Sequence, residues 1–321
     1  FHFELGKLGS SFAHIDPKKE GRAMCEIYGA YGWNTGVRTM KYLTDHFLVR
    51  GINTYVPHAF SPKAFPDPDC PPHFYAHGEN PQYRHFGALM AYMNRVCELI
   101  SDGVHVAPVA VLYHGEGEWM GKAMYSHKVA HVLADAQIDY DFIPQDVFSE
   151  TEKYRTRLSD GCLKVNTQDY RALIVPAMPF VTPEFAAYVE TMKAAGVSVW
   201  FIDNCPDGLT GTVMGLEDVV PSVCGHYFRD VTLCPANNRI RYYHYIHEDQ
   251  TEVYLIVKEE TQAYTGTIHV KNTGTAYGYN AWDNCLEPVE VKTDGEGTEI
   301  ALTVEPLKPQ IVIFDGGVSG E

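Results

Sequence analysis

Residues 22–60 read RAMCEIYGAYGWNTGVRTMKYLTDHFLVRGINTYVPHAF, and this stretch decides the fold of the N-terminal part of the chain. A short apolar run at 22–28 is followed by a segment rich in Gly and aromatic residues, a helical pattern over 35–48 and a second short run over 51–56. Strand, helix and strand in this order predict a β-α-β unit with parallel strands. In (β/α)8 barrels, active sites lie at the C-terminal ends of such strands.

A single carboxylate, Glu26, stands inside the first apolar run. Burial of a lone carboxylate costs several kcal/mol unless the group is paired or serves a function. The structural alternative is an ion pair with Arg22 or Arg50. Sugar rings offer apolar faces for stacking and hydroxyls for hydrogen bonds, so a carboxylate among Tyr and Trp side chains favours glycoside chemistry. We therefore take Glu26 as the candidate catalytic residue.

Aromatic and polar side chains follow both predicted strands. Tyr31 and Trp33 come after the first strand, where they can stack on a sugar ring, and Tyr28 fits this role and core packing equally well. Asn53 belongs to the second strand and His58 to its exit, where the active site of a barrel would lie. A single His is more often structural, so it is the position of His58 that argues for substrate binding.

Three segments carry a resemblance to a known group of enzymes: SSFAHIDPKKEGRAMCEIYGAYGW at 10–33, RGINTYVPHAF at 50–60 and VAVLYHGEGEWMG at 109–121. They resemble the C-terminal half of large bacterial glycoside hydrolases, in particular α-L-rhamnosidase-like enzymes and related (β/α)8-barrel β-galactosidases. Because such enzymes are much longer, the resemblance implies that the chain begins inside a barrel, near its seventh strand.

The resemblance also implies a role for Glu26. In such enzymes a pair of carboxylates works together, one as general acid and the other as base or nucleophile. The partner of Glu26 would stand on an earlier strand, upstream of Phe1. The chain by itself is therefore expected to be catalytically incomplete.

Strand–helix alternation resumes near residue 104 and predicts a flavodoxin-like doubly wound domain over 104–228. The resemblance implies an amidotransferase-like domain at this place. No Cys stands at a strand-to-helix elbow, so no amidotransferase activity is expected. The expected elements are the strand 106–113, the helix 122–136, the strands 138–143 and 172–175, the helix 183–194 and the strand 197–202.

The segment HGEGEW, residues 114–119, directly follows the first strand of that domain. Ligands of doubly wound folds bind at the C-terminal ends of the strands, so Glu116, Glu118 and Trp119 are candidate substrate contacts. The alternatives are an acidic surface loop or an interdomain contact. The glycines do not form GxGxxG and the chain has no P-loop, so nucleotide binding is not indicated.

From residue 229 the apolar pattern changes to a period of two, which predicts an antiparallel β-sandwich over 229–321. Residues 1–103 then hold the C-terminal elements of a (β/α)8 barrel. The predicted fold class is α/β: partial barrel elements, a flavodoxin-like domain and a β-sandwich. The expected sandwich strands are 240–246, 252–257, 266–270, 276–282, 289–292, 299–304 and 310–314.

The formal net charge of −16 over 321 residues argues against nucleic acid as a partner, because phosphate binding needs clustered Lys and Arg. No apolar run approaches the roughly 18 residues of a membrane span, so no membrane partner is expected. The eight cysteines are scattered without a CxxC pair, and several sit in apolar strand-like runs. This favours reduced, buried thiols and a cytoplasmic setting, and no zinc site is expected from them.

Two HxxxH pairs, His73/His77 and His127/His131, raise the question of a metal site. Neither pair has the adjacent Glu of HExxH, and no third ligand is evident, although His85 follows the first pair. We expect structural or substrate-contacting roles for these residues, no metal and no cofactor.

The sequence thus predicts a fragment of a glycoside hydrolase that acts on O-glycosidic bonds of a carbohydrate substrate. Two alternatives stay open: a non-catalytic carbohydrate-binding or assembly module, and a non-hydrolytic α/β enzyme that uses residues 114–119. An open edge at strands 22–28 and 51–56 would promote aggregation. Either a second copy of the chain, giving a homo-oligomer, or the second domain is expected to cover it.

Overall fold

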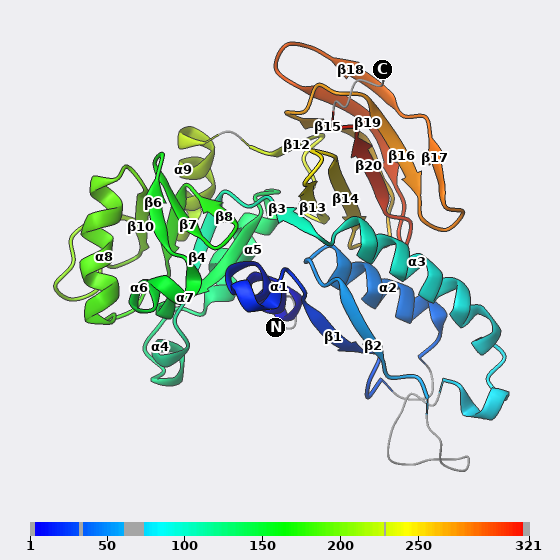
Figure 1. Cartoon of the computed structure of the whole chain (residues 1–321), viewed down its shortest axis with the longest axis horizontal. Helices are drawn as coiled ribbons and strands as arrows, with labels where there is room; N and C mark the ends of the chain where they lie inside the picture. The colour runs from blue at the N-terminus through cyan, green and yellow to red at the C-terminus, as the bar shows by residue number, and fades with distance from the viewer. Residues whose placement is uncertain (1–3, 32–34, 61–73, 228, 317–321) are drawn as a thin grey trace.

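The computed structural model describes residues 4–31, 35–60, 74–227 and 229–316 (Figure 1). Within these residues the strands form a two-stranded and a five-stranded parallel sheet, and antiparallel sheets of three, four and six strands. The predicted mixed α/β fold, with antiparallel sheets toward the C-terminus, is confirmed. No helix in these ranges is both long and apolar enough to cross a membrane.

The N-terminal segment forms the predicted β-α-β unit, in which β1 and β2 pair in parallel with Glu26 opposite Val56. The helices α2 and α3 pack beside each other and bury Met40, Leu48 and Tyr92 in a core shared with the six-stranded antiparallel sheet. The elements of this segment are α1 (Leu5–Ile15), η2 (Pro17–Lys19), β1 (Met24–Ile27), α2 (Val37–Leu48), β2 (Thr54–Pro57), η3 (Ala76–Gly78), η4 (Tyr83–His85) and α3 (Phe86–Leu99).

The five-stranded parallel sheet has the order β11-β10-β9-β4-β5. Its central strands are buried on both faces, as their continuous apolar runs predict. The helix α8 begins at Thr182, whose Oγ1 accepts a hydrogen bond from the Phe185 N–H, with Pro183 in its first turn. The elements are β4 (Val109–Tyr113), α4 (Gly115–Trp119), α5 (Ser126–Asp135), β5 (Tyr140–Pro144), α6 (Asp146–Ser149), α7 (Thr151–Tyr154), β9 (Ala172–Val175), α8 (Pro183–Ala194), β10 (Ser198–Ile202), β11 (Thr212–Met214), η5 (Leu216–Asp218) and α9 (Val219–His226).

The C-terminal strands form two antiparallel sheets, with orders β12-β15-β19-β18 and β17-β16-β20-β14-β13-β3. Alternate residues of both sheets, among them Ile268 and Val312, share one buried core. The strands are β12 (Val231–Cys234), β13 (Ile240–His247), β14 (Glu252–Lys258), β15 (Tyr264–Val270), β16 (Ala276–Asn280), β17 (Cys285–Glu287), β18 (Glu290–Thr293), β19 (Thr298–Val304) and β20 (Gln310–Phe314).

The strand predicted over 106–113 is shorter than expected, because Pro108 lacks an N–H for the ladder and β4 begins only at Val109. The residues before it form β3 (Gly103–His105), which pairs with β13 of the C-terminal sheet. Three short strands between α7 and β9 were not predicted. They are β6 (Arg157–Ser159), β7 (Cys162–Val165) and β8 (Gln168–Tyr170), which form the three-stranded sheet.

The helix α1 lies between the β1–β2 unit and the parallel sheet, with contacts to both β1 and β5 (Figure 1). One buried ion pair joins the N-terminal unit to the C-terminal part: Arg50 Nη1 donates to Glu259 Oε1 at 2.7 Å. Side-chain contacts therefore hold the N-terminal unit against the C-terminal sheets, in addition to the covalent backbone. The seven cysteines in the described ranges have free thiols, but Cys162 is the only one of these seven that is buried. The prediction of buried thiols is wrong for Cys234 and Cys285, which are exposed.

Candidate active site

Glu26 and His58 meet at the C-terminal ends of β1 and β2. The parallel register places Ile27 opposite Pro57, and the His58 N–H extends the ladder by donating to the Ile27 carbonyl at 2.7 Å. The side chains then converge: His58 Nδ1 lies 3.1 Å from Glu26 Oε1. Two residues from separate strands are thus brought together by strand pairing alone.

The turn after β1 lets the two side chains approach each other. Tyr28 and Ala30 have φ values of 76° and 63°, a conformation that side chains other than Gly rarely adopt. A Cβ at Gly29 would lie 3.1 Å from His58 Nδ1, so glycine leaves the space that the imidazole needs. Strained backbone of this kind gathers at functional sites, where surrounding structure holds it in place.

A cavity of about 550 Å³ opens beside Glu26. One wall comes from α1, where Leu5, Gly6 and Gly9 face it. The remaining lining residues are Met24, Cys25, Glu26, Ile27, Tyr28, Gly29, Ala30, Tyr31, Phe47, Ile52 and His58. This volume is in the range of small-molecule sites, roughly 300–1,000 Å³.

The exposure of Glu26 differs from the expectation. The Glu26 side chain is 65% exposed, so the argument from the cost of burying it is wrong for this chain. Its ion-pair partner is His58, whereas Arg50 is engaged with Glu259. The case for Glu26 therefore depends on its place at the mouth of the cavity.

The predicted aromatic residues have different positions. Tyr31 is about half exposed and lines the cavity, so its ring is accessible to a ligand. Tyr28 is buried, and its hydroxyl is 2.6 Å from Thr44 Oγ1; burial raises its pKa to about 12. Its hydroxyl is thus committed to the fold, although its ring borders the cavity. Trp33 lies outside the described residues.

Asn53 is placed away from Glu26, just before β2 begins. Its Oδ1 accepts from the Ala23 N–H at 3.0 Å, and its Nδ2 donates to the Gly21 and Ile100 carbonyls. The amide therefore ties β1 to the end of α3. Asn53 is not among the residues that line the Glu26 cavity.

The residues of the 114–119 segment form the short helix α4, on the other side of α1 from β1 and β2 in Figure 1. Glu118 Oε1 accepts hydrogen bonds from the Ser126 N–H and Oγ, which satisfies donors at the start of α5. Glu116 is exposed, and Trp119 is 84% exposed. None of the three lines the Glu26 cavity.

One buried carboxyl was missed in the sequence; it lies near Glu118 and Tyr140 of the neighbouring domain and does not line the Glu26 cavity. Glu4 precedes Leu5, the first cavity residue of α1, and is buried. Burial, together with the negative charge of Glu118, raises the pKa of Glu4 to about 8, so this carboxyl is protonated at neutral pH. A protonated carboxyl can act as a hydrogen-bond donor or general acid. The residue stands in an amphipathic helical pattern, and nothing in that pattern distinguishes it from a surface Glu.

No family model and no curated protein sequence matches the chain. Solved structures do. The rhamnosidase from Novosphingobium sp. PP1Y matches with a TM-score of 0.75 and 17% identity, over 99% of this chain and 33% of that one. The solved structures that resemble this chain include the rhamnosidase, a β-galactosidase and a fucosidase, all of them glycoside hydrolases.

Two further neighbours agree. The β-galactosidase from Rahnella sp. R3 has a TM-score of 0.61 at 10% identity, over 97% of this chain and 58% of that one. The α-L-fucosidase isoenzyme 2 from Paenibacillus thiaminolyticus has a TM-score of 0.57 at 12% identity, over 88% and 57%. The resemblance to rhamnosidase-like enzymes and β-galactosidases found in the sequence is thereby confirmed as a likeness of fold. The chain spans about a third of the length of the rhamnosidase.

Proposed function

We propose that the chain is the C-terminal portion of a glycoside hydrolase in which Glu26 is one of two catalytic carboxylates. The observation that carries this is the exposed Glu26–His58 pair at the mouth of a cavity, at the C-terminal ends of two parallel strands. Its structural neighbours, a rhamnosidase, a β-galactosidase and a fucosidase, support a carbohydrate as the substrate.

In this proposal, residues 1–103 are the last elements of a (β/α)8 barrel, 104–228 a flavodoxin-like domain and 229–321 a β-sandwich. The order β5-β4-β9-β10-β11, renumbered along the chain, reads 2-1-3-4-5, which is the order of flavodoxin-like sheets. Because β3 pairs with β13, residues 103–105 belong to a sheet of the sandwich. The boundary between the first and second domains, near residue 103, therefore lies at the edge of the sandwich sheet.

The chemistry follows from the carboxylate and its neighbours. His58 engages Oε1 of Glu26, which leaves Oε2 as the oxygen for the substrate. A second carboxylate on the opposite side of the scissile bond completes the pair, and the separation between the two decides whether the anomeric configuration is retained or inverted. Tyr31 supplies an aromatic face at the same cavity, on which a sugar ring can stack.

The test is Glu26→Gln in the full-length protein, assayed with chromogenic α-L-rhamnosides and β-galactosides. Loss of a catalytic carboxylate predicts a fall in kcat of several decades with an unchanged Tm, because the side chain is exposed. The matched control is Glu184→Gln, an exposed carboxylate at the start of α8, which should leave turnover unchanged. Near-normal turnover of Glu26→Gln refutes the proposal.

One observation favours a second candidate, a non-catalytic carbohydrate-binding or assembly module. In the described residues β1 and β2 pair only with each other, and Met24 and Val56 are exposed on them. Such a sheet needs a cover, from further strands or from a second copy of the chain. Calorimetric titration with L-rhamnose and galactose, beside the chromogenic assay, separates binding without turnover from hydrolysis.

A further inference from the structure

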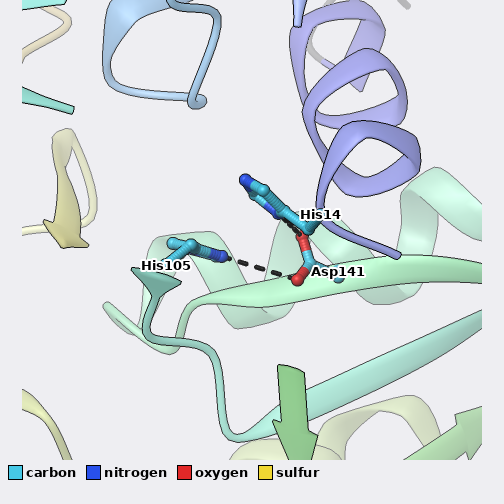
Figure 2. Close-up of side chains that lie close together, drawn as sticks. All are labelled: His14, His105 and Asp141. Atoms are coloured by element: carbon cyan, nitrogen blue, oxygen red, sulfur yellow. Dashed lines mark hydrogen bonds and ion pairs between the residues drawn. The ribbon is translucent and has the colours of Figure 1, made fainter. Parts of the chain in front are cut away.

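Three buried side chains from distant parts of the sequence meet where α1, β3 and β5 come together. We call His14, His105 and Asp141 the His–Asp cluster; it lies apart from the Glu26 cavity and shares no residue with it (Figure 2). All three residues are at most 5% exposed. In Figure 2 one nitrogen of each imidazole points at the Asp141 carboxylate, each toward a different oxygen.

The separations between these atoms suit ligands of a common cation. His14 Nδ1 is 2.9 Å from Asp141 Oδ1, and His105 Nδ1 is 3.5 Å from Asp141 Oδ2. Atoms bound to one zinc ion at about 2.1 Å are roughly 3.0–3.4 Å apart. One ligand atom from each residue lies within 4.8 Å of the others, so the two imidazoles need to close by at most about 1.4 Å around an ion.

The remote nitrogens of both imidazoles are held by fixed partners. His14 Nε2 is 3.0 Å from the Tyr243 hydroxyl, and His105 Nε2 is 2.7 Å from Asp139 Oδ2. In metal sites, a ligating His usually holds a carboxylate, carbonyl or other polar group at its other nitrogen, which fixes the tautomer and the direction of the ring. Here that arrangement leaves both Nδ1 atoms directed at the cluster.

The two carboxylate oxygens of Asp141 are also held in place by hydrogen bonds. Ser11 Oγ donates to Asp141 Oδ1 at 3.0 Å, and Tyr170 donates to Asp141 Oδ2 at 2.9 Å. His105 Nδ1 is fully buried, and its contact with Asp141 Oδ2 at 3.5 Å is longer than an ordinary hydrogen bond. A buried nitrogen held at this distance from a carboxylate oxygen leaves room for a cation to draw the two atoms together.

We propose that the His–Asp cluster is a binding site for a divalent transition metal, with zinc the best match. Two imidazoles and a carboxylate are zinc ligands, and Asp141 binding through both oxygens gives four donor atoms. Full burial leaves no open position for a substrate, so the role is structural: the ion joins α1, β3 and β5.

The sequence does not reveal this site, because its ligands are 91 and 36 residues apart and belong to no spacing motif. The pairs with HxxxH spacing do not form a metal site within the described residues. His73 lies outside the described residues, while His131 is exposed and paired with Asp135 at 3.4 Å. The expectation that the chain holds no metal came from those pairs and from the scattered cysteines.

The experiment uses the whole chain, stripped with a chelator and dialysed against zinc or cobalt(II). We expect one ion per chain by elemental analysis, a rise in Tm, and visible absorption bands from cobalt with nitrogen and oxygen ligands. Asp141→Asn and His105→Gln should each weaken zinc binding by at least about 100-fold. The matched control is His244→Gln, another buried His paired with a carboxylate, which should bind zinc like the wild type.

Two results overturn the proposal. One is wild-type protein that, after dialysis, holds no zinc or cobalt above the buffer and keeps its metal-free Tm. The other is zinc binding that is equal in the wild type, Asp141→Asn and His105→Gln, which places the ion elsewhere. Asp141→Asn and His105→Gln test the same site separately, so one folded variant is enough to decide between these outcomes.

Discussion

His58 Nδ1 lies 3.1 Å from Glu26 Oε1, although the two residues are 32 positions apart in the chain. The parallel register of β1 and β2 brings them together, and the turn through Tyr28 and Ala30 keeps the space between them open. A carboxylate that is held by an imidazole has a fixed direction. We expect this contact to position Glu26 for catalysis.

His58→Ala tests that role. Without the imidazole the exposed Glu26 carboxylate can rotate, and a misplacement of about 1 Å can cost roughly 100-fold in rate. We expect kcat in the full-length protein to fall by roughly 10- to 100-fold with little change in KM. His226→Ala, an exposed His at the end of α9, is the control and should keep wild-type kinetics. Unchanged kcat in His58→Ala would mean that the imidazole does not orient the carboxylate.

Gly29→Ala probes the same contact from the backbone. The new methyl group would lie 3.1 Å from His58 Nδ1, so the imidazole must move by a few tenths of an ångström. We expect a loss of turnover in the same direction as for His58→Ala, and no further loss when both changes are combined. Gly87→Ala, where an added Cβ meets nothing within 4 Å, is the control. Additive losses in the double variant would contradict a shared cause.

Tyr31→Ala removes the accessible aromatic face of the cavity. Stacking of aromatic groups is worth about 0.5–1.5 kcal/mol, so we expect KM to rise by roughly 2- to 12-fold with a smaller effect on kcat. Tyr31→Phe should retain wild-type KM, because it keeps the face. Tyr277→Ala, an exposed Tyr on β16, should have no effect. An unaltered KM for Tyr31→Ala excludes stacking at this position.

Glu259→Gln should destabilise the fold by about 3 kcal/mol, because it leaves the buried Arg50 without its carboxylate. Burial raises the pKa of Glu259, but Arg50 and His46 outweigh this and hold it well below its usual value. The stabilisation of the fold by the ionised Glu259 carboxylate is therefore present above pH 4.5 and is lost as the pH falls through the folded-state pKa. Urea unfolding at a series of acidic pH values should show wild type and variant converging; a constant difference would contradict the assignment.

His244 gives the opposite dependence on pH. Burial lowers its pKa, but Asp230 and Glu252, 3.0 and 3.2 Å away, outweigh this and raise it to about 9. Its contribution, on the order of 3 kcal/mol, is complete below pH 6.5 and is lost as the pH rises through 9. We expect the difference in unfolding free energy between wild type and His244→Gln to shrink over this range. A difference that grows with pH would mean that the imidazole is neutral in the folded protein.

The β-α-β unit was predictable because its apolar periods are local. Glu26 was singled out as the carboxylate inside the first strand and His58 as the residue that follows the second. Asn53 shows the limit of that reasoning. It precedes β2, at the end of the strand opposite to His58, and the residues at 51–56 do not show where pairing begins. The strand begins three residues later than predicted, at Thr54 instead of residue 51, so Asn53 lies before it and ties the backbone, away from the cavity.

Residues that depend on contacts distant in sequence were not predictable. Glu4 becomes a protonated carboxyl because the fold buries it and because Glu118 of α4 lies close to it. His105 directly precedes the strand predicted over 106–113, whereas it belongs to the edge of the C-terminal sheet and meets Asp141 of the parallel sheet. The periodicity of apolar residues along the sequence does not predict such long-range contacts.

The helix α1 has two occupied faces. Leu5, Gly6 and Gly9 border the cavity, while Lys7 and His14 pair with Asp139 and Asp141. Detaching the parallel sheet would part Asp139 from Lys7 and Asp141 from His14, and would remove the wall against which a ligand rests. The three segments outlined along the sequence should therefore melt as one cooperative body, and no proteolytic cut between them should release an independently folded piece.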